Sequence, residues 1–505
     1  MTTSRRQFLR GAALLTAAST LPRWLGSAQA ATLDGYAGSR AAVCVFLLGG
    51  CDTNNVLVPR LGNAYAQYGA ARPTLGLALK DLLKISPTGL PAESFGLHPA
   101  LNRVHGHFNN GRAAFVCNVG PLVMPTNQQD YLTGQVPLPD SLFSHSDQQD
   151  AWASALANPS TSSLSPDLKV TGWGGRTAER LHPLNTDSQG YPEVTSFGGK
   201  ARFGVAPTLP PLLVAPDGVL AMKSTGDENF DSLRVSSLRQ VMSAQEGNLL
   251  ETAYAGVFGT ADLFSVERAG ARETAWNALA PATREGIEQA FTEGADPSWT
   301  LTAQLYQVVR DLVAGALERG RGGLGLKRQL FSVGFGSFDT HQNQLDTQEA
   351  LLTQLDFSLD AFQRAMTLLE TEPLFGATPP QATLFTMSDF SRTLVENSDG
   401  GTDHGWGGHA LVLGSQVNGG RLYGTFPNLD VASSTNTDTT DKKGRWIPTL
   451  SVEQYGFTLA SWLGLSTAAD REFAFPNLGP YVDEAVRRGF PLQAQRYRIA
   501  FMKTS

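Results

Sequence analysis

Seven acidic or imidazole side chains occupy four short polar segments of this chain, and they are the residues best able to do chemistry. They are Asp52, Asp339, His341, Asp389, Asp403, His404 and His409. Carboxylate oxygens combined with neutral imidazoles suit Zn²⁺, Mn²⁺ or Fe²⁺, whereas carboxylates alone would suit Ca²⁺ or Mg²⁺. The sequence therefore predicts a divalent metal site, with the identity and the number of the ions left open.

The spacing within these segments limits how the side chains can be arranged. Asp339 and His341 are two residues apart, which does not place two side chains on one face of a helix, so they would converge in a turn or an extended segment. His404 and His409 are five residues apart in a glycine-rich loop. Either imidazole could turn toward a metal there, and we expect only one of them to do so.

A further polar cluster, residues 144–150, could supply a nucleophile. Ser144 beside a bound cation would be activated, because the cation stabilises the alkoxide form. The same residues are also an ordinary helix N-terminus, in which a serine accepts a hydrogen bond from a backbone amide. We favour capping as the local role of this segment, and the two roles are compatible.

Strands and helices must position these side chains. Five continuous apolar runs are typical of strands that are covered on both faces, namely residues 41–48, 112–120, 329–334, 382–387 and 410–414. Helical patterns lie between some of them, at residues 301–318, 351–369 and 452–464. This alternation predicts an α/β fold with a doubly wound, mostly parallel sheet and helices on both faces.

The predicted sheet also predicts where the metal site lies. Ligands of an open α/β sheet bind beyond the carboxyl ends of its strands. Asp52, Asp339 and Asp389 each come shortly after an apolar run, and residues 401–409 directly precede another. We therefore expect the site at one edge of the sheet.

The composition changes over residues 157–231, which are rich in proline, glycine, serine and threonine. We interpret this segment as an insertion or a cover over the active edge, and a surface excursion without a binding role fits it equally well. Residues 31–505 are otherwise expected to form one α/β domain.

The first thirty residues have the three regions of a twin-arginine export signal. Arg5 and Arg6 precede an apolar stretch, residues 11–21, and the small-residue site Ala28-Gln29-Ala30. We expect cleavage there and a periplasmic or secreted protein. Cleavage would remove four arginines and no acid, which changes the net charge from −7 to −11. Such acidity without a basic run argues against nucleic-acid binding.

Two further features narrow the class of protein. No segment reaches the roughly 20 consecutive apolar residues that a membrane-spanning helix needs. The three cysteines, Cys44, Cys51 and Cys117, are too few for a disulfide framework.

Several segments, in order along the chain, resemble the DUF1501 family of secreted bacterial proteins. The similar segments are the leader, residues 46–52, 72–75, 96–101, Ser144-His145 with Gln149-Asp150, and residues 338–341, 388–390, 401–405, 445–448 and 451–455. The resemblance implies a relation to the alkaline phosphatase and sulfatase superfamily, whose members bind one or two divalent metals and hydrolyse phosphate or sulfate esters.

The resemblance also implies roles for single residues. Asp52 is similar to the ligand after the first strand, and Asp339 with His341 resembles the Asp-and-His pair of the superfamily. Asp389 matches a ligand that follows a strand. His404 or His409 matches the last histidine ligand. Ser144 lies in the region of the nucleophile. The chain departs from the pattern at Phe390, where a ligating histidine would follow Asp389.

Two functional hypotheses follow. The first is an exported metal-dependent hydrolase of a phosphate or sulfate ester, carried by a small molecule or a polysaccharide. The second is a non-catalytic exported protein that binds a partner or a polysaccharide on the same scaffold, with the ion serving stability. Phe390 motivates the second hypothesis.

Overall fold

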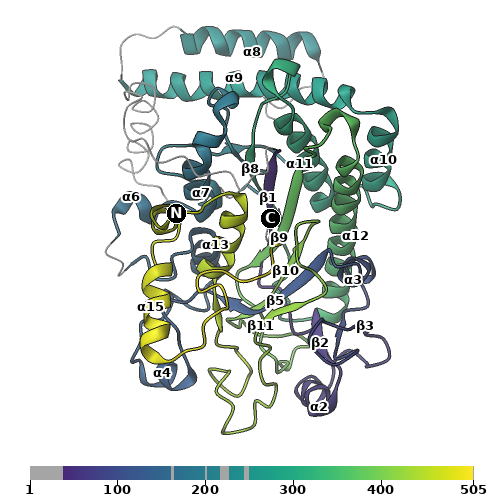
Figure 1. Ribbon diagram of the computed structural model, residues 1–505, viewed down its shortest axis with the longest axis vertical. Helices are drawn as coiled ribbons and strands as arrows, with labels where there is room; N and C mark the ends of the chain where they lie inside the picture. The colour runs from purple at the N-terminus through teal and green to yellow at the C-terminus, as the bar shows by residue number, and fades with distance from the viewer. Residues whose placement is uncertain (1–37, 161–163, 200–201, 217–226, 244–248, 504–505) are drawn as a thin grey trace.

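A nine-stranded sheet runs through the centre of the computed structural model, which describes residues 38–160, 164–199, 202–216, 227–243 and 249–503 (Figure 1). The strand order is β11-β5-β10-β9-β1-β8-β6-β7, and β12 pairs with β5. The bounds are β1 Arg40–Leu47, β5 Ala113–Gly120, β6 Val194–Ser196, β7 Leu212–Leu213, β8 Arg328–Phe335, β9 Gln381–Ser388, β10 Gly408–Leu413, β11 Leu422–Gly424 and β12 Leu450–Ser451. The predicted leader, residues 1–30, lies outside the described residues.

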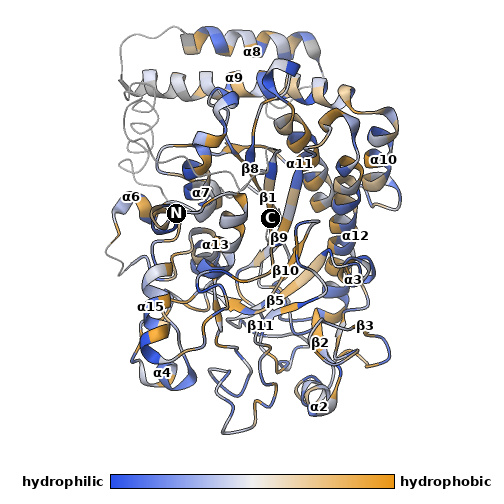
Figure 2. Cartoon of the chain, viewed as in Figure 1, coloured by the Kyte–Doolittle hydropathy of each residue, from blue (hydrophilic) through white to orange (hydrophobic). Residues whose placement is uncertain are grey.

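The pairings in this sheet are parallel except those of β10, which runs antiparallel to β5 and β9. The prediction of a mostly parallel α/β sheet is therefore confirmed. The five apolar runs correspond to β1, β5, β8, β9 and β10, and the strands of the sheet are largely apolar (Figure 2).

Helices pack on the sheet and extend around it. Their bounds are α2 Gly62–Ala71, α3 Asn102–Asn109, α4 Gln128–Thr133, α5 His145–Ser154, α6 Pro166–Lys169, α7 Trp173–Leu181, α8 Glu228–Ser243, α9 Leu249–Ala278, α10 Pro281–Thr292, α11 Thr300–Ala316, α12 Gln344–Glu370, α13 Val452–Leu463, α14 Ala468–Ala474 and α15 Leu478–Arg488. The predicted helices correspond to α11, α12 and α13, and α12 begins seven residues earlier than its apolar pattern.

The surroundings of strand β1 explain why its residues 41–47 are all apolar. Val43 packs in a core with side chains of α11 and α12, while its neighbour Cys44 packs in a second core with side chains of α7 and α13. Helices cover both sides of the strand, so alternate residues are buried on opposite faces. Figure 1 shows α11 and α12 on one side of the sheet and α7 and α13 on the other.

The register of the central strands places the carboxyl ends of β1, β8 and β9 at the same edge of the sheet. Leu47, the last residue of β1, pairs with Phe335 at the end of β8 and with Ser388 at the end of β9. Because β10 is antiparallel, its first residue, Gly408, lies at this same edge, opposite Val119 near the end of β5. The loops after β1 and β8 and the loop that joins β9 to β10 therefore leave the sheet together.

Two further parts complete the fold. Strands β2 (Leu57–Pro59), β4 (Phe95–Leu97) and β3 (Leu83–Ile85) form a small antiparallel sheet. In the described part of residues 157–231, β6 and β7 extend the central sheet and α7 is buried. Helices α8 and α9 lie side by side at the top of Figure 1, joined by the Arg239–Asp262 ion pair at 2.8 Å.

Within the described ranges, no helix is long and apolar enough to cross a membrane. Cys44, Cys51 and Cys117 are buried free thiols.

A buried acid at the start of α13 gives a prediction for stability. Burial raises the pKa of Glu453 from its ordinary 4.5 to about 7, against the opposing effects of Ser451 and Arg176. Folding therefore favours the protonated acid, and the contribution of Glu453 to stability is greatest below pH 4.5 and falls as the pH rises to about 7. Glu453→Gln should remove this dependence and stabilise the protein by roughly 3 kcal/mol above pH 7.

Urea denaturation at pH 5 and pH 8 measures this effect. The wild type should lose stability between the two values, and the variant should lose much less. Equal pH dependence in both proteins would contradict the assignment to Glu453.

Candidate metal centre

Three side chains from separate parts of the chain meet at the edge where the strands end. His145 is the first residue of α5, Asp339 lies in the loop after β8, and His404 lies in the loop before β10. One ligand atom from each can be chosen so that all three atoms lie within 4.8 Å of one another. His145 Nε2 is 3.5 Å from Asp339 Oδ2, and His404 Nε2 is 3.5 Å from Asp339 Oδ1.

The hydrogen bonds of the two imidazoles determine which nitrogen carries the proton. His145 Nδ1 contacts Asp389 Oδ2 at 2.6 Å, and His404 Nδ1 contacts the carbonyl oxygen of Phe143 at 2.9 Å. A carboxylate and a carbonyl oxygen only accept, so each Nδ1 is the donor, and a neutral imidazole then has its lone pair on Nε2. Both Nε2 atoms are buried and have no hydrogen-bond partner in the described part of the chain.

The pKa values of His404 and Asp339 are shifted in the directions that favour binding of a cation. Burial lowers the pKa of His404, so this imidazole is neutral at pH 7. Burial alone would raise the pKa of Asp339, but the hydrogen bond and charge of Arg392 outweigh it and hold that pKa below its usual value. The Asp339 side chain is 47% exposed, so the group is open to solvent on this side.

Asp389 supports His145 instead of joining the three atoms. Its Oδ2 accepts from His145 Nδ1, from Gln149 Nε2 at 2.9 Å and from the backbone N–H of Gly49 at 3.2 Å. His145 and Gln149 are four residues apart on α5, so both face the same carboxylate. In this structure Asp389 therefore lies behind His145, fully buried, and outside the group of three atoms.

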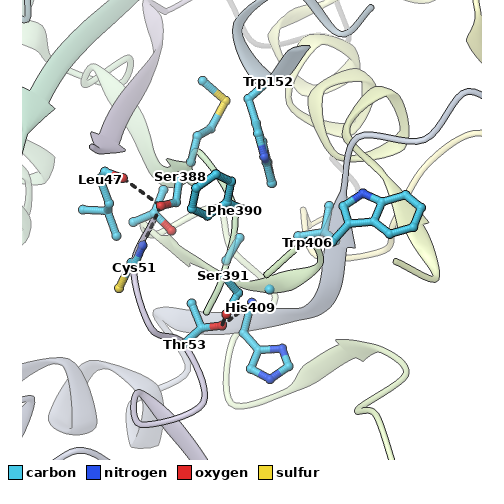
Figure 3. Close-up of a pocket in the computed structure, with 14 residues that line it drawn as sticks. Leu47, Cys51, Thr53, Trp152, Ser388, Phe390, Ser391, Trp406 and His409 are labelled. Atoms are coloured by element: carbon cyan, nitrogen blue, oxygen red, sulfur yellow. Dashed lines mark hydrogen bonds between the residues drawn. The ribbon is translucent and has the colours of Figure 1, made fainter. Parts of the chain in front are cut away.

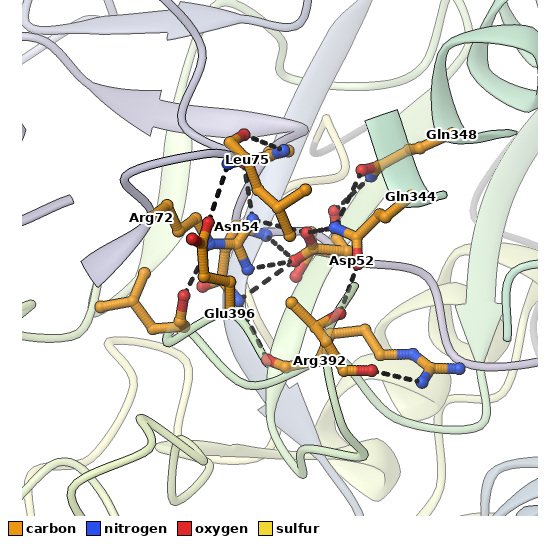
Figure 4. A network of polar contacts seen from close by, with 12 residues as sticks. Asp52, Asn54, Arg72, Leu75, Gln344, Gln348, Arg392 and Glu396 are labelled. Carbon is orange, nitrogen blue, oxygen red and sulfur yellow. Dashed lines mark hydrogen bonds and ion pairs between the residues drawn. The ribbon is translucent and has the colours of Figure 1, made fainter. Parts of the chain in front are cut away.

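The structure does not bring Asp52 into the group. Its carboxylate is 1% exposed and pairs with Arg72 at 2.5 Å (Figure 4). Asn54 donates to Oδ1 and Gln344 to Oδ2, so both oxygens are occupied by the protein itself. Asp52, predicted as a ligand, is in this structure the partner of a buried ion pair.

Asp403 and His409 also point elsewhere. Asp403 pairs with Lys443 at 2.7 Å. His409 is buried, its Nδ1 accepts from the backbone N–H of Asn118 at 3.2 Å, and its ring stacks on Phe426. Burial lowers the pKa of His409 to about 3. Of the two histidines in this loop, His404 is thus the one beside Asp339.

His341 and Ser144 border the group. His341 Nδ1 contacts Asp339 Oδ1 at 2.9 Å, and its ring lies beside that of His404 with 4.9 Å between centroids. Ser144 occupies the N-cap position of α5, as expected, but its side chain accepts no hydrogen bond from the helix backbone. Its hydroxyl donates to Asp147 Oδ2 at 2.6 Å.

Phe390 forms the wall behind the imidazoles. Its ring centroid is 4.8 Å from that of His145 and 4.6 Å from that of His404. A Cβ on Gly50, whose φ is +81°, would lie 2.5 Å from this ring, so only glycine fits there. Beyond Phe390 lies a mostly apolar pocket that Trp152 and Trp406 also line (Figure 3).

Three residues of this centre are not among the ligands and the nucleophile predicted from the sequence: His145, Gln149 and Arg392. The four-residue spacing of His145 and Gln149, in a segment expected to begin a helix, was the signal that could have found them. Arg392 had no local signal, because most of its partners lie in other loops and Thr402 is ten residues away in its own loop.

A family model described as a protein of unknown function (DUF1501) matches residues 266–441. This span includes Asp339, Asp389, Arg392 and His404 and excludes His145. The match supports the resemblance to that family. No curated protein matches the chain.

Proposed function

We propose that this protein is an exported hydrolase of a phosphate or sulfate ester that binds one divalent transition-metal ion through His145, Asp339 and His404. The proposal of a metal site rests on one observation. The buried Nε2 lone pairs of His145 and His404 face the ionised carboxylate of Asp339. Electron-rich atoms at this separation repel one another unless a cation lies between them.

The donor set and its spacing fit such an ion. Ligand atoms about 2.1 Å from a tetrahedral zinc ion lie about 3.4 Å apart. His145 Nε2 lies 3.5 Å from Oδ2 of Asp339 and His404 Nε2 lies 3.5 Å from Oδ1, and one ligand atom from each residue can be chosen so that all three lie within 4.8 Å of one another. Two imidazoles and one carboxylate favour zinc, manganese or iron over calcium or magnesium. The Asp389 carboxylate behind His145 is the kind of support that metal-ligating histidines usually have.

A divalent ion in this place would supply a Lewis acid that polarises an ester oxygen. Asp389 and the Phe143 carbonyl hold the protons of the two imidazoles on Nδ1 and so aim the Nε2 atoms. Ser144 directly precedes His145, and its hydroxyl proton already points to the Asp147 carboxylate. We therefore keep Ser144 as the candidate nucleophile. The ester class rests on the family resemblance, and the exposed side of Asp339 is where a substrate would enter.

The second hypothesis, a non-catalytic exported protein that binds a partner or a polysaccharide, has its own support. Phe390 supplies an apolar ring beside the imidazoles, and Arg392 already neutralises part of the Asp339 charge. In this case metal removal should lower the melting temperature, and no ester should be hydrolysed.

Metal analysis and activity distinguish the two hypotheses. Protein purified from its native compartment should contain one transition-metal ion per chain, and a panel of aryl phosphates and sulfates should show turnover that chelation removes and metal restores. Bound metal without turnover would favour the second hypothesis, and protein without metal after incubation with Zn²⁺ would refute both.

The substitution Asp389→Asn tests whether the Asp389 carboxylate supports His145 as a metal ligand. The amide removes the negative charge behind the imidazole, so Zn²⁺ affinity should fall about 10- to 100-fold, as for comparable supporting residues. Calorimetric titration measures this change. Asp360→Asn is the matched control, because Asp360 pairs with His107 at 2.9 Å outside the candidate centre. Equal affinities in both variants would contradict the proposed role.

A further inference from the structure

Arg392 lies at the point where the three loops of the site edge meet, namely residues 48–56, 336–343 and 389–407. It is fully buried, and its Nε donates to the carbonyl of Gly50 at 2.9 Å and its Nη1 to the carbonyl of Thr402 at 3.1 Å. Its Nη2 donates to the carbonyls of Gly49 and Phe338 and to Asp339 Oδ1. Arg392 itself follows β9, so one guanidinium joins the loops at the ends of β1, β8, β9 and β10.

Each of the three proposed metal ligands depends on one of these contacts. Arg392 holds Asp339 directly, through Oδ1, which leaves Oδ2 toward His145. It holds the carbonyl of Thr402, two residues before His404. It also binds the carbonyl of Gly49, whose N–H donates to Asp389, the residue that holds His145.

The contacts of Arg392 require a guanidinium group, and they require the backbones of the loops to approach each other closely. Only arginine offers five N–H donors in a fixed plane, and a lysine ammonium could reach fewer of these acceptors. The loops come this close because glycine stands at position 49, where a Cβ would lie 2.6 Å from the backbone nitrogen of Asp339. The φ of Gly49 is +108°, which also favours glycine.

We infer that Arg392 is the positioning residue of the metal centre: it couples the three strand-end loops and thereby places all three ligands. This inference rests on the proposed metal site. Of the three ligands, Arg392 contacts only Asp339 directly. It also binds the backbone carbonyls that position His404 and His145, so its role extends beyond stability.

Binding of Co²⁺ to the variants Arg392→Lys and Arg176→Lys tests the inference. Co²⁺ is the probe because the visible spectrum of the bound ion reports the arrangement of its ligands. Arg392→Lys should lower Co²⁺ affinity at least 10-fold, in the range of other supporting residues, and should change the spectrum. Arg176→Lys is the matched control. Arg176 is also fully buried and donates to backbone carbonyls of Ser154, Thr171 and Ala474, so its loss affects stability alone.

The results of the metal titrations distinguish a failure of the inference from a failure of the proposed function. Wild-type affinity and spectrum in Arg392→Lys would overturn the inference and leave the metal site intact. Absence of Co²⁺ and Zn²⁺ binding in the wild type would overturn the proposed function, and the inference with it.

Hydrogen exchange of the wild type provides a test that does not depend on a variant folding. Zn²⁺ should slow amide exchange in residues 48–52, which hold none of the three ligands, together with residues 338–341 and 389–404. Protection confined to the ligand-bearing loops would overturn the coupling through Arg392.

Discussion

His145→Ala should abolish tight Zn²⁺ binding and leave the fold intact. The substitution removes one of three protein ligands. If the binding energy of a zinc site, about 10–16 kcal/mol, is divided among its ligands, the loss is roughly 3–4 kcal/mol, or two to three orders of magnitude in affinity. His145 lies at the start of α5 with a side chain 31% exposed, so its truncation leaves the core unchanged.

Titration of the variant with Zn²⁺, with thermal unfolding recorded in parallel, measures both parts of this result. His182→Ala is the matched control, because His182 also bonds a carboxylate, Glu193, at 2.5 Å and lies outside the candidate centre. Unchanged affinity in His145→Ala would show that the metal, if bound, lies elsewhere. It would also remove the observation on which the proposed function rests.

Asp52→Asn should destabilise the protein severely and leave its metal affinity unchanged. Asp52 and Arg72 form an ion pair in which both side chains are fully buried. Removing one charge leaves the other uncompensated in the interior, which costs about 3–5 kcal/mol. Because Asp52 contacts Arg72, Asn54 and Gln344 and not the three ligands, metal binding should persist.

Urea denaturation and Zn²⁺ titration of the same variant separate the two roles of this residue. Asp483→Asn is the control for a charge change, since its partner Arg496 and Asp483 itself are exposed, and such pairs contribute about 0–1 kcal/mol. A large loss of metal affinity in Asp52→Asn, with stability retained, would instead favour the ligand role that the family resemblance implies.

The sequence by itself determined the fold class and the edge at which the site lies. The apolar runs of β1, β8 and β9 predict parallel strands buried on both faces, because a strand covered by helices on each side has no polar face. Parallel strands also end at one edge, so Asp339 and Asp389, each just after its strand, had to lie near each other. The antiparallel β10 adds His404, which precedes its strand.

Only the tertiary structure decided which of these side chains face one another. Asp52 has the sequence context of a ligand, yet Arg72, twenty residues further along the chain, occupies its oxygens. Asp389 turns to His145, which is 244 residues distant in sequence. The direction of a side chain in a loop depends on the charges and donors packed around it, and residues remote in sequence supply these. The short-range pattern of the chain therefore predicts the edge, while long-range packing determines which side chains form the proposed metal centre and places Arg392 beside them.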